Sequence, residues 1–218
     1  ASIHSLWAGY QEYLGQRFGT DISFSLQTPL IPLGIDCQKF SKNRDQSVRV
    51  KQRCLLGFDE DEVVVLFSGR LSYFAKAHPL PLYLAAERAA KETKKKVHLL
   101  FYGYFQSETF ETDFRDAALG ICENAAVSFV TNTQPEFSDG VWAAADIFVS
   151  PSDNIQESFG LTPIEAMASG LPVVISDWDG YRDLITHGIE GFLIPTLAPP
   201  PGTGIDQANR FLSQQDNY

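Results

Sequence analysis

Val63-Val-Val-Leu-Phe67 is a continuous apolar run, and Ser68-Gly69 ends it with two small turn-forming residues. Its valines favour a strand, and the lack of polar alternation indicates that both faces of the strand are covered. This pattern is typical of a parallel sheet. Comparable short apolar runs recur at residues 97–102, 126–130, 147–149, 172–175 and 192–194.

Segments with helical character separate these runs. We expect helices over residues 4–18, 44–55, 80–95, 108–119, 136–145, 162–169 and 181–186. Strands that alternate with helices of this length indicate βαβ units with right-handed crossovers. The predicted fold class is therefore α/β, with a doubly wound, Rossmann-like parallel sheet.

Composition and charge exclude several classes of protein. The 218 residues are 44% hydrophobic, with a formal net charge of −10. This hydrophobic content is enough to bury a core, which excludes a disordered chain. No apolar run approaches the ~20 residues that span a bilayer, so we expect no transmembrane segment. Net acidity argues against broad nucleic-acid binding, because that binding depends on Lys and Arg neutralising phosphates.

Few other signatures are present. The three cysteines, Cys37, Cys54 and Cys122, lack zinc or redox spacing, and with no secretory signal they predict a cytoplasmic protein. No G-x-G-x-x-G follows a strand, and P-loop, H-E-x-x-H and G-x-S-x-G spellings do not occur. Two D-x-D spellings could indicate a metal site. Residues 59–61 precede a strand and residues 177–179 follow one. We expect neither a metal nor a cofactor.

In doubly wound sheets, ligands bind outside the carboxyl ends of the strands. Gly69 and Arg70 follow the first strand, with Lys76 six residues after Arg70. Two cations suit a diphosphate, and glycines allow the backbone to approach a ligand closely. The residues at the ends of the next two strands, which we also include in the candidate site, are Tyr102, Gly103, Val130 and Asn132.

The segment after the fourth strand, residues 150–165, is rich in polar groups. Thr162 is spaced as a helix N-cap, with Pro163 at the first helical position, so free backbone N–H groups should face the cleft. Glu165 has two interpretations at this point: it closes a capping box with Thr162, or it binds a ligand. Glu157 likewise is either a solvated loop carboxylate or a ligand-binding group.

Glu157-Ser-Phe-Gly-Leu-Thr-Pro-Ile-Glu165 resembles the E-x7-E motif of retaining glycosyltransferases of family 4 (group 1), which have the GT-B fold. The resemblance continues through residues 166–180 and 188–195. Upstream, residues 32–36 are similar to the family's P-x-G-I-D segment and residues 67–71 to its G-R-L donor loop. In total, the resemblance covers roughly residues 28–196.

The resemblance implies that this chain is the nucleotide-sugar donor half of a hexosyltransferase. Arg70 and Lys76 would neutralise the donor diphosphate, Glu165 would hold the ribose hydroxyls, and Glu157 would bind the hydroxyls of the transferred sugar. Backbone N–H groups would face the sugar and phosphate, and the base would lie against backbone at the ends of the second and third strands. The backbone N–H groups implied here are those of Phe159, Gly160 and Leu161. The residues implied to lie against the base are Tyr102, Gly103, Val130 and Asn132.

Two segments depart from the family pattern. Lys76 lies six residues after Arg70 where the family usually has five, and Ala77 replaces the glycine that follows the lysine. The family's glycine pair after the next strand reads Asp179-Gly180 here, and its P-E dipeptide reads Arg182-Asp183.

The resemblance also implies a domain organisation. Residues 1–27 would be the end of an N-terminal domain and a connector, 28–196 the donor-binding domain, and 197–218 a Pro/Gly-rich linker or tail. The acceptor would bind to the missing N-terminal domain, so we expect the chain alone to bind nucleotide without transferring sugar. The sequence does not decide whether the full-length enzyme contacts a membrane peripherally. The alternatives are a non-catalytic nucleotide-binding or interaction module, and a GT-B-like sugar-nucleotide epimerase or phosphorylase.

Overall fold

The structure is a computed structural model that describes residues 2–23, 29, 31–134, 137, 140–154, 157 and 159–197. A first helix, α1 (Ser2–Phe18), falls where the sequence predicts one. The proposed connector and tail fall largely on residues 24–28, 30 and 198–218, which lie outside the described residues. The domain boundaries therefore stay a prediction.

Six parallel strands form one sheet in the order β3-β2-β1-β4-β5-β6. This order confirms the predicted doubly wound sheet, because the chain leaves β1 toward one edge and later returns beside β1 to build toward the other. The strands are β1 (Val63–Leu71), β2 (Val97–Phe105), β3 (Ala126–Thr131), β4 (Ile147–Ser150), β5 (Val173–Ser176) and β6 (Gly191–Ile194).

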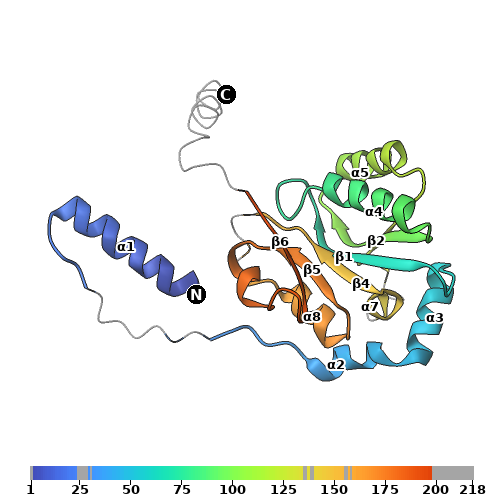
Figure 1. Cartoon of the computed structure of the whole chain (residues 1–218), viewed down its shortest axis with the longest axis horizontal. Helices are drawn as coiled ribbons and strands as arrows, with labels where there is room; N and C mark the ends of the chain where they lie inside the picture. Colours follow the sequence, from blue (N-terminus) through green and yellow to red (C-terminus); the bar gives the residue numbers. More distant parts are fainter. Residues whose placement is uncertain are drawn as a thin grey trace.

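Helices cover both faces of the sheet (Figure 1). One face carries α4 (Leu80–Thr93) and α5 (Glu108–Ile121). The other face carries the helices that precede β1 and the short helices that follow β3 and β4. These are α2 (Cys37–Ser41), η1 (Lys42–Arg44), α3 (Gln46–Leu56), α7 (Val141–Ala144) and α8 (Leu161–Ala168).

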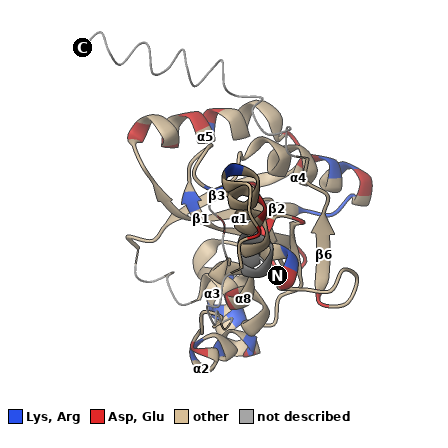
Figure 2. Ribbon diagram, turned by 90° about the vertical axis from the view of Figure 1, so that its left-hand side faces the viewer, with Lys and Arg blue, Asp and Glu red and all other residues tan. Residues whose placement is uncertain are grey.

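The apolar run of β1 explains why two layers of helices are needed. Val64 and Leu66 are fully buried on the face of α7 and α8, whereas Phe67 is buried on the face of α4 and α5. A strand that is apolar at every position buries both of its faces only between two helical layers. Figure 2 shows acidic residues on α5 and both signs of charge around α2 and α3.

One charged cluster ties α3 to the sheet. Asp146, the residue before β4, pairs with Arg49 at 2.5 Å and with Arg53 at 3.3 Å. The same carboxylate accepts a hydrogen bond from the backbone N–H of Val64 at 2.8 Å. This cluster lies at the amino ends of β1 and β4, opposite the end where a doubly wound sheet binds ligands.

Several predicted helices differ in the structure. The polar helix expected from residue 44 begins at Gln46, because Asp45 caps it by accepting from the Ser47 N–H at 2.8 Å. The helix expected over 181–186 is instead a 3-10 turn, η2 (Asp179–Asp183). Of the helix expected over 136–145, the structure defines α7, while residues 135, 136, 138 and 139 lie outside the described part.

None of the helices in the described part of the chain combines the length and the apolar character that crossing a bilayer requires.

Candidate functional site

The candidate site lies at the carboxyl ends of β1 and β4, the two strands between which the sheet changes direction. β1 and β4 are parallel neighbours, joined in register at Val65–Ile147 and Leu66–Phe148. The chain leaves these strands in opposite directions, and doubly wound sheets bind ligands in the crevice between two such connections. The loop after β1 brings Lys76 to this crevice, and the loop after β4 brings Glu157.

Lys76 and Glu157 form an ion pair at this edge of the sheet, with side chains that are 13% and 11% exposed. The Ser152 hydroxyl donates either to the Lys76 carbonyl at 2.9 Å or to Glu157 Oε2 at 3.3 Å. The Gly180 N–H donates to the backbone carbonyl of Glu157 at 3.1 Å, which fixes the loop beside η2. The structure thus brings together the cation and the carboxylate that the sequence placed 81 residues apart.

Tyr181 forms the floor beneath this pair. Its ring is fully buried, with the Lys76 ammonium 5.7 Å from the ring centroid. Its hydroxyl lies 3.0 Å from the Ser150 hydroxyl, and burial raises its pKa. A methyl group on Gly160 would come within 2.1 Å of the ring, so only glycine fits there. Tyr181 therefore positions both Lys76 and the start of α8.

β1 and β2 run further than the sequence predicts, so Gly69 and Arg70 lie within β1 and Gly103 lies within β2 rather than after these strands. The two glycines differ in what surrounds them. The Lys76 side chain lies along Gly69, with carbons 3.4 Å from where a Cβ of Gly69 would be. A Cβ on Gly103 would lie 1.8 Å from the carbonyl oxygen of Gly69, its register partner. Close strand packing alone therefore requires glycine at position 103.

Glu165 lines a second hollow, with a volume of about 180 Å³, on the α2 side of the crevice. Burial raises the pKa of Glu165, and the nearby positive charge of Lys39 partly offsets this rise. Tyr102 and Ser68 reach the same hollow from β2 and β1. The complete lining is Lys39, Phe40, Asn43, Ser68, Tyr102, Trp142 and Glu165.

The capping-box interpretation of Glu165 is wrong. Helix α8 begins at Leu161, with Gly160 as its N-cap at φ +88°, so Thr162 is the second helical residue. Among the described residues, the buried Thr162 hydroxyl oxygen has no hydrogen-bond partner. Within the described residues no side chain caps the helix start, so its first N–H groups can face a ligand.

The other predicted residues lie around the Lys76–Glu157 pair and the hollow of Glu165. Arg70 is exposed and donates to the Ala75 carbonyl at 3.3 Å. Val130 is buried in the core, and the Asn132 N–H donates to the Gly103 carbonyl at 2.8 Å. At the start of α8, Gly160 is buried, Phe159 is half-buried and Leu161 is exposed.

Sequence reasoning missed Tyr181, Ser152 and Lys39. Ser152 belongs to the polar segment after β4, so its position at a strand end was a usable signal. Lys39 and Tyr181 left no such signal, because they reach the site from an early helix and from the turn after β5.

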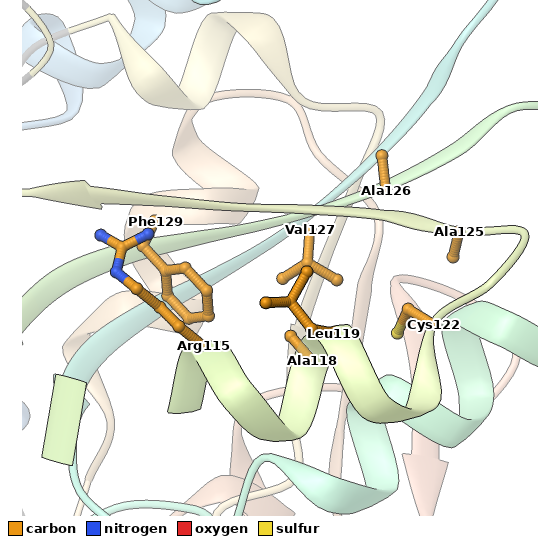
Figure 3. A pocket seen from close by; sticks show the side chains of 8 residues that line it. All are labelled: Arg115, Ala118, Leu119, Cys122, Ala125, Ala126, Val127 and Phe129. Atoms are coloured by element: carbon orange, nitrogen blue, oxygen red, sulfur yellow. The ribbon is translucent and has the colours of Figure 1, made fainter. Parts of the chain in front are cut away.

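A larger apolar pocket lies elsewhere, between α5 and the edge strand β3 (Figure 3). Its volume is about 340 Å³. The guanidinium of Arg115 lies 4.9 Å from the Phe129 ring centroid and also pairs with Glu111 at 2.7 Å. None of the residues predicted for the site lines this pocket, which lacks the paired carboxylate and ammonium of the β1/β4 edge.

Solved structures share this architecture. The Anabaena protein HepE, in complex with UDP and glucose, superposes with a TM-score of 0.59 at 25% identity, over 81% of this chain and 44% of that protein. WaaG, a glycosyltransferase involved in lipopolysaccharide biosynthesis, superposes with a TM-score of 0.59 at 23% identity, over 85% of this chain and 46% of its own. The fold is therefore that of one half of a GT-B glycosyltransferase.

Sequence comparisons give the family. The D-inositol 3-phosphate glycosyltransferase of Geodermatophilus obscurus is 33% identical over 179 residues, 79% of this chain. This chain spans only 38% of the length of that relative. The family model for group 1 glycosyl transferases matches residues 49–200, which include the loops that carry Lys76, Glu157 and Glu165. The chain therefore belongs to the group 1 glycosyltransferases.

Proposed function

We propose that this chain binds the nucleotide-diphosphate sugar donor of a retaining glycosyltransferase that transfers a hexose. The observation that carries the proposal is the convergence of Lys76, Glu157 and the uncapped start of α8 on the β1/β4 crevice, beside the hollow that holds Glu165. Cations and N–H donors match a diphosphate, and the two carboxylates match the hydroxyls of the sugar and of the ribose.

Arg70 and Lys76 would bind the diphosphate. Lys76 is a compact charge that is already held at the crevice, whereas exposed Arg70 can offer a planar fork of two N–H donors. Together with the N–H groups of Phe159, Gly160 and Leu161, at and just before the start of α8, they supply positive charge where the leaving group becomes more negative. Because these groups can neutralise the diphosphate, we propose that the reaction needs no metal ion.

Glu165 would bind the ribose hydroxyls inside the 180 Å³ hollow. An ionised carboxylate accepts two hydroxyl hydrogen bonds, and Lys39 favours the ionised form. The base would then lie against the backbone near Tyr102 and Gly103 on β2 and near Val130 and Asn132 on β3.

Glu157 would accept hydrogen bonds from the hydroxyls of the transferred sugar. The retaining reaction passes through an oxocarbenium-like transition state, so holding the sugar and neutralising the departing diphosphate both lower the barrier. That HepE, at 25% identity, is found with UDP and glucose supports a hexose donor and makes UDP the first nucleotide to test.

The acceptor would bind to a second domain. The chain spans 44% of HepE and 38% of the Geodermatophilus relative. We therefore propose that the donor half binds nucleotide by itself but needs the other half of the GT-B fold for transfer. Substantial sugar transfer by these 218 residues alone would contradict this part of the proposal.

Calorimetric titration of the chain with UDP, GDP and ADP tests the proposal. We expect saturable binding of one nucleotide, weakened by Glu165→Ala and by Arg70→Ala. Loss of a buried carboxylate contact should cost about 1.5–3 kcal/mol, or roughly tenfold to a hundredfold in Kd. Glu60→Ala and Arg88→Ala, which change exposed residues outside the site, are the matched controls. Equal losses in all four variants, or no binding, would contradict the proposal.

A further inference from the structure

The Lys76–Glu157 ion pair joins two groups to which the proposed function gives different ligands. Lys76 would bind the diphosphate and Glu157 the sugar, yet each satisfies the charge of the other. A donor that enters the crevice must therefore replace or share this contact. The inference that follows rests on the proposed function and concerns which ligands can replace or share the contact between Lys76 and Glu157.

Both side chains are held in their places. The Lys76 stem runs along Gly69, and its ammonium lies over the Tyr181 ring. Glu157 has the Ser152 hydroxyl within 3.3 Å and a backbone fixed by Gly180. Because both side chains are close to nine-tenths buried, water compensates little for a lost partner.

We propose that the Lys76–Glu157 pair makes the site discriminate between a nucleotide sugar and the free nucleoside diphosphate. The sugar hydroxyls of the complete donor can donate to Glu157 and so replace the ammonium that moves to the phosphates. The free diphosphate brings an extra negative charge and no hydroxyl donors to that side, so Glu157 loses its partner and repels the ligand.

The pair also favours release of the product. Once the sugar has left the nucleotide, Glu157 has lost its hydroxyl partners, and Lys76 is the cation that pairs with it in the structure. Re-forming the ion pair then competes with the hold of Lys76 on the diphosphate. Glu157 is thus a specificity-determining residue: it strengthens the binding of the nucleotide sugar and weakens the binding of the diphosphate product.

A double-mutant cycle tests this inference on the 218-residue chain. The variants are Glu157→Gln, Lys76→Met and the double variant, each titrated with UDP, GDP and ADP and with their glucose esters. Glutamine keeps the shape of Glu157 and its contact with Ser152, and methionine keeps an apolar stem beside Gly69. Thermal melts confirm that each variant is folded before it is titrated.

For the nucleotide that binds, we expect Glu157→Gln to raise the affinity for the free diphosphate by about fivefold or more. The preference for the glucose ester over the free diphosphate should fall by at least as much. Lys76→Met should weaken diphosphate binding about tenfold. In the Lys76→Met background the gain from Glu157→Gln should be much smaller, because no ammonium is left to be released.

Asp153→Asn removes one negative charge from an exposed position in the same loop and is the matched control, with an expected change below about twofold. An equal gain from Glu157→Gln in both backgrounds, or no gain, would overturn the inference while leaving the proposed function intact. Unchanged diphosphate affinity in Lys76→Met, or no binding of any nucleotide by the unaltered chain, would instead contradict the proposed function.

Discussion

Gly160→Ala tests whether Tyr181 forms the floor of the site. Gly160 has φ +88°, and a methyl group on it would lie 2.1 Å from Cε1 of the fully buried Tyr181 ring. The left-handed backbone should cost alanine about 1–2 kcal/mol, and overpacking a buried site should add about 1–3 kcal/mol. We therefore expect the free energy of unfolding to fall by about 2–5 kcal/mol.

Gly188→Ala is the matched control. Its φ of +82° is nearly the same, but no atom lies within 4 Å of where its Cβ would be. Urea denaturation of both variants separates the two contributions, because the control carries only the backbone cost. We expect Gly160→Ala to be the less stable variant by about 1–3 kcal/mol.

The same substitution should affect ligand binding. To admit the methyl group, the Tyr181 ring must move, and the Lys76 ammonium lies over that ring. Nucleotide affinity should therefore fall in Gly160→Ala and stay unchanged in Gly188→Ala. If the two variants are equally stable and bind equally well, the contact between Gly160 and Tyr181 and the argument built on it are refuted.

Three further predictions concern carboxylates. Hydrogen bonds from Asn124, mainly from its side chain and also from its backbone N–H, lower the pKa of Glu87 to about 2. The contribution of Glu87 to stability is therefore present above about pH 4.5 and lost toward pH 2. Glu87→Gln should flatten that part of the acid-unfolding curve, and an unchanged curve would refute this. Asp146→Ala should lower the free energy of unfolding by about 2 kcal/mol, because it leaves Arg49 and Arg53 without their carboxylate; a loss below 0.5 kcal/mol in urea titrations would contradict it. Burial raises the pKa of Glu165, so nucleotide binding should weaken on acidification at a higher pH than an ordinary glutamate would give, and Glu165→Gln should remove that titration in calorimetry at several pH values.

The sequence was sufficient to predict the sheet because its signals are local. The run of residues 63–67 is apolar at every position, and Val64 and Phe67 do face opposite helical layers. The strand-end rule likewise selected the loops of Lys76 and Glu157, which the structure brings into contact. Parallel strands end at one edge, so order along the chain is enough to predict this convergence.

The start of α8 shows where local reasoning failed. Thr162 followed by Pro163 is a good helix-start signal, but the helix begins one residue before Thr162. Gly160 takes a left-handed conformation against the Tyr181 ring, a contact between residues 21 positions apart that no local pattern records. Tertiary packing thus freed Glu165 from a capping role and left it lining the hollow with Lys39.

The neighbours of the site residues were harder to predict than the residues themselves. Tyr181 was expected in a helix, but it lies in the 3-10 turn η2, which the chain forms directly after β5. Its place under Lys76 depends on how that turn packs against the loop after β4, through the bond from Gly180 to Glu157. Such contacts are set by the packed core rather than by spacing.

The most direct test of the central claim is a crystal structure of the chain with the nucleotide sugar that titration identifies as its ligand. The account predicts the diphosphate beside Lys76 and the start of α8, the ribose on Glu165, and the sugar hydroxyls on Glu157 in place of the ammonium. A nucleotide bound instead in the pocket between α5 and β3, with the Lys76–Glu157 pair intact, would contradict it (Figure 3).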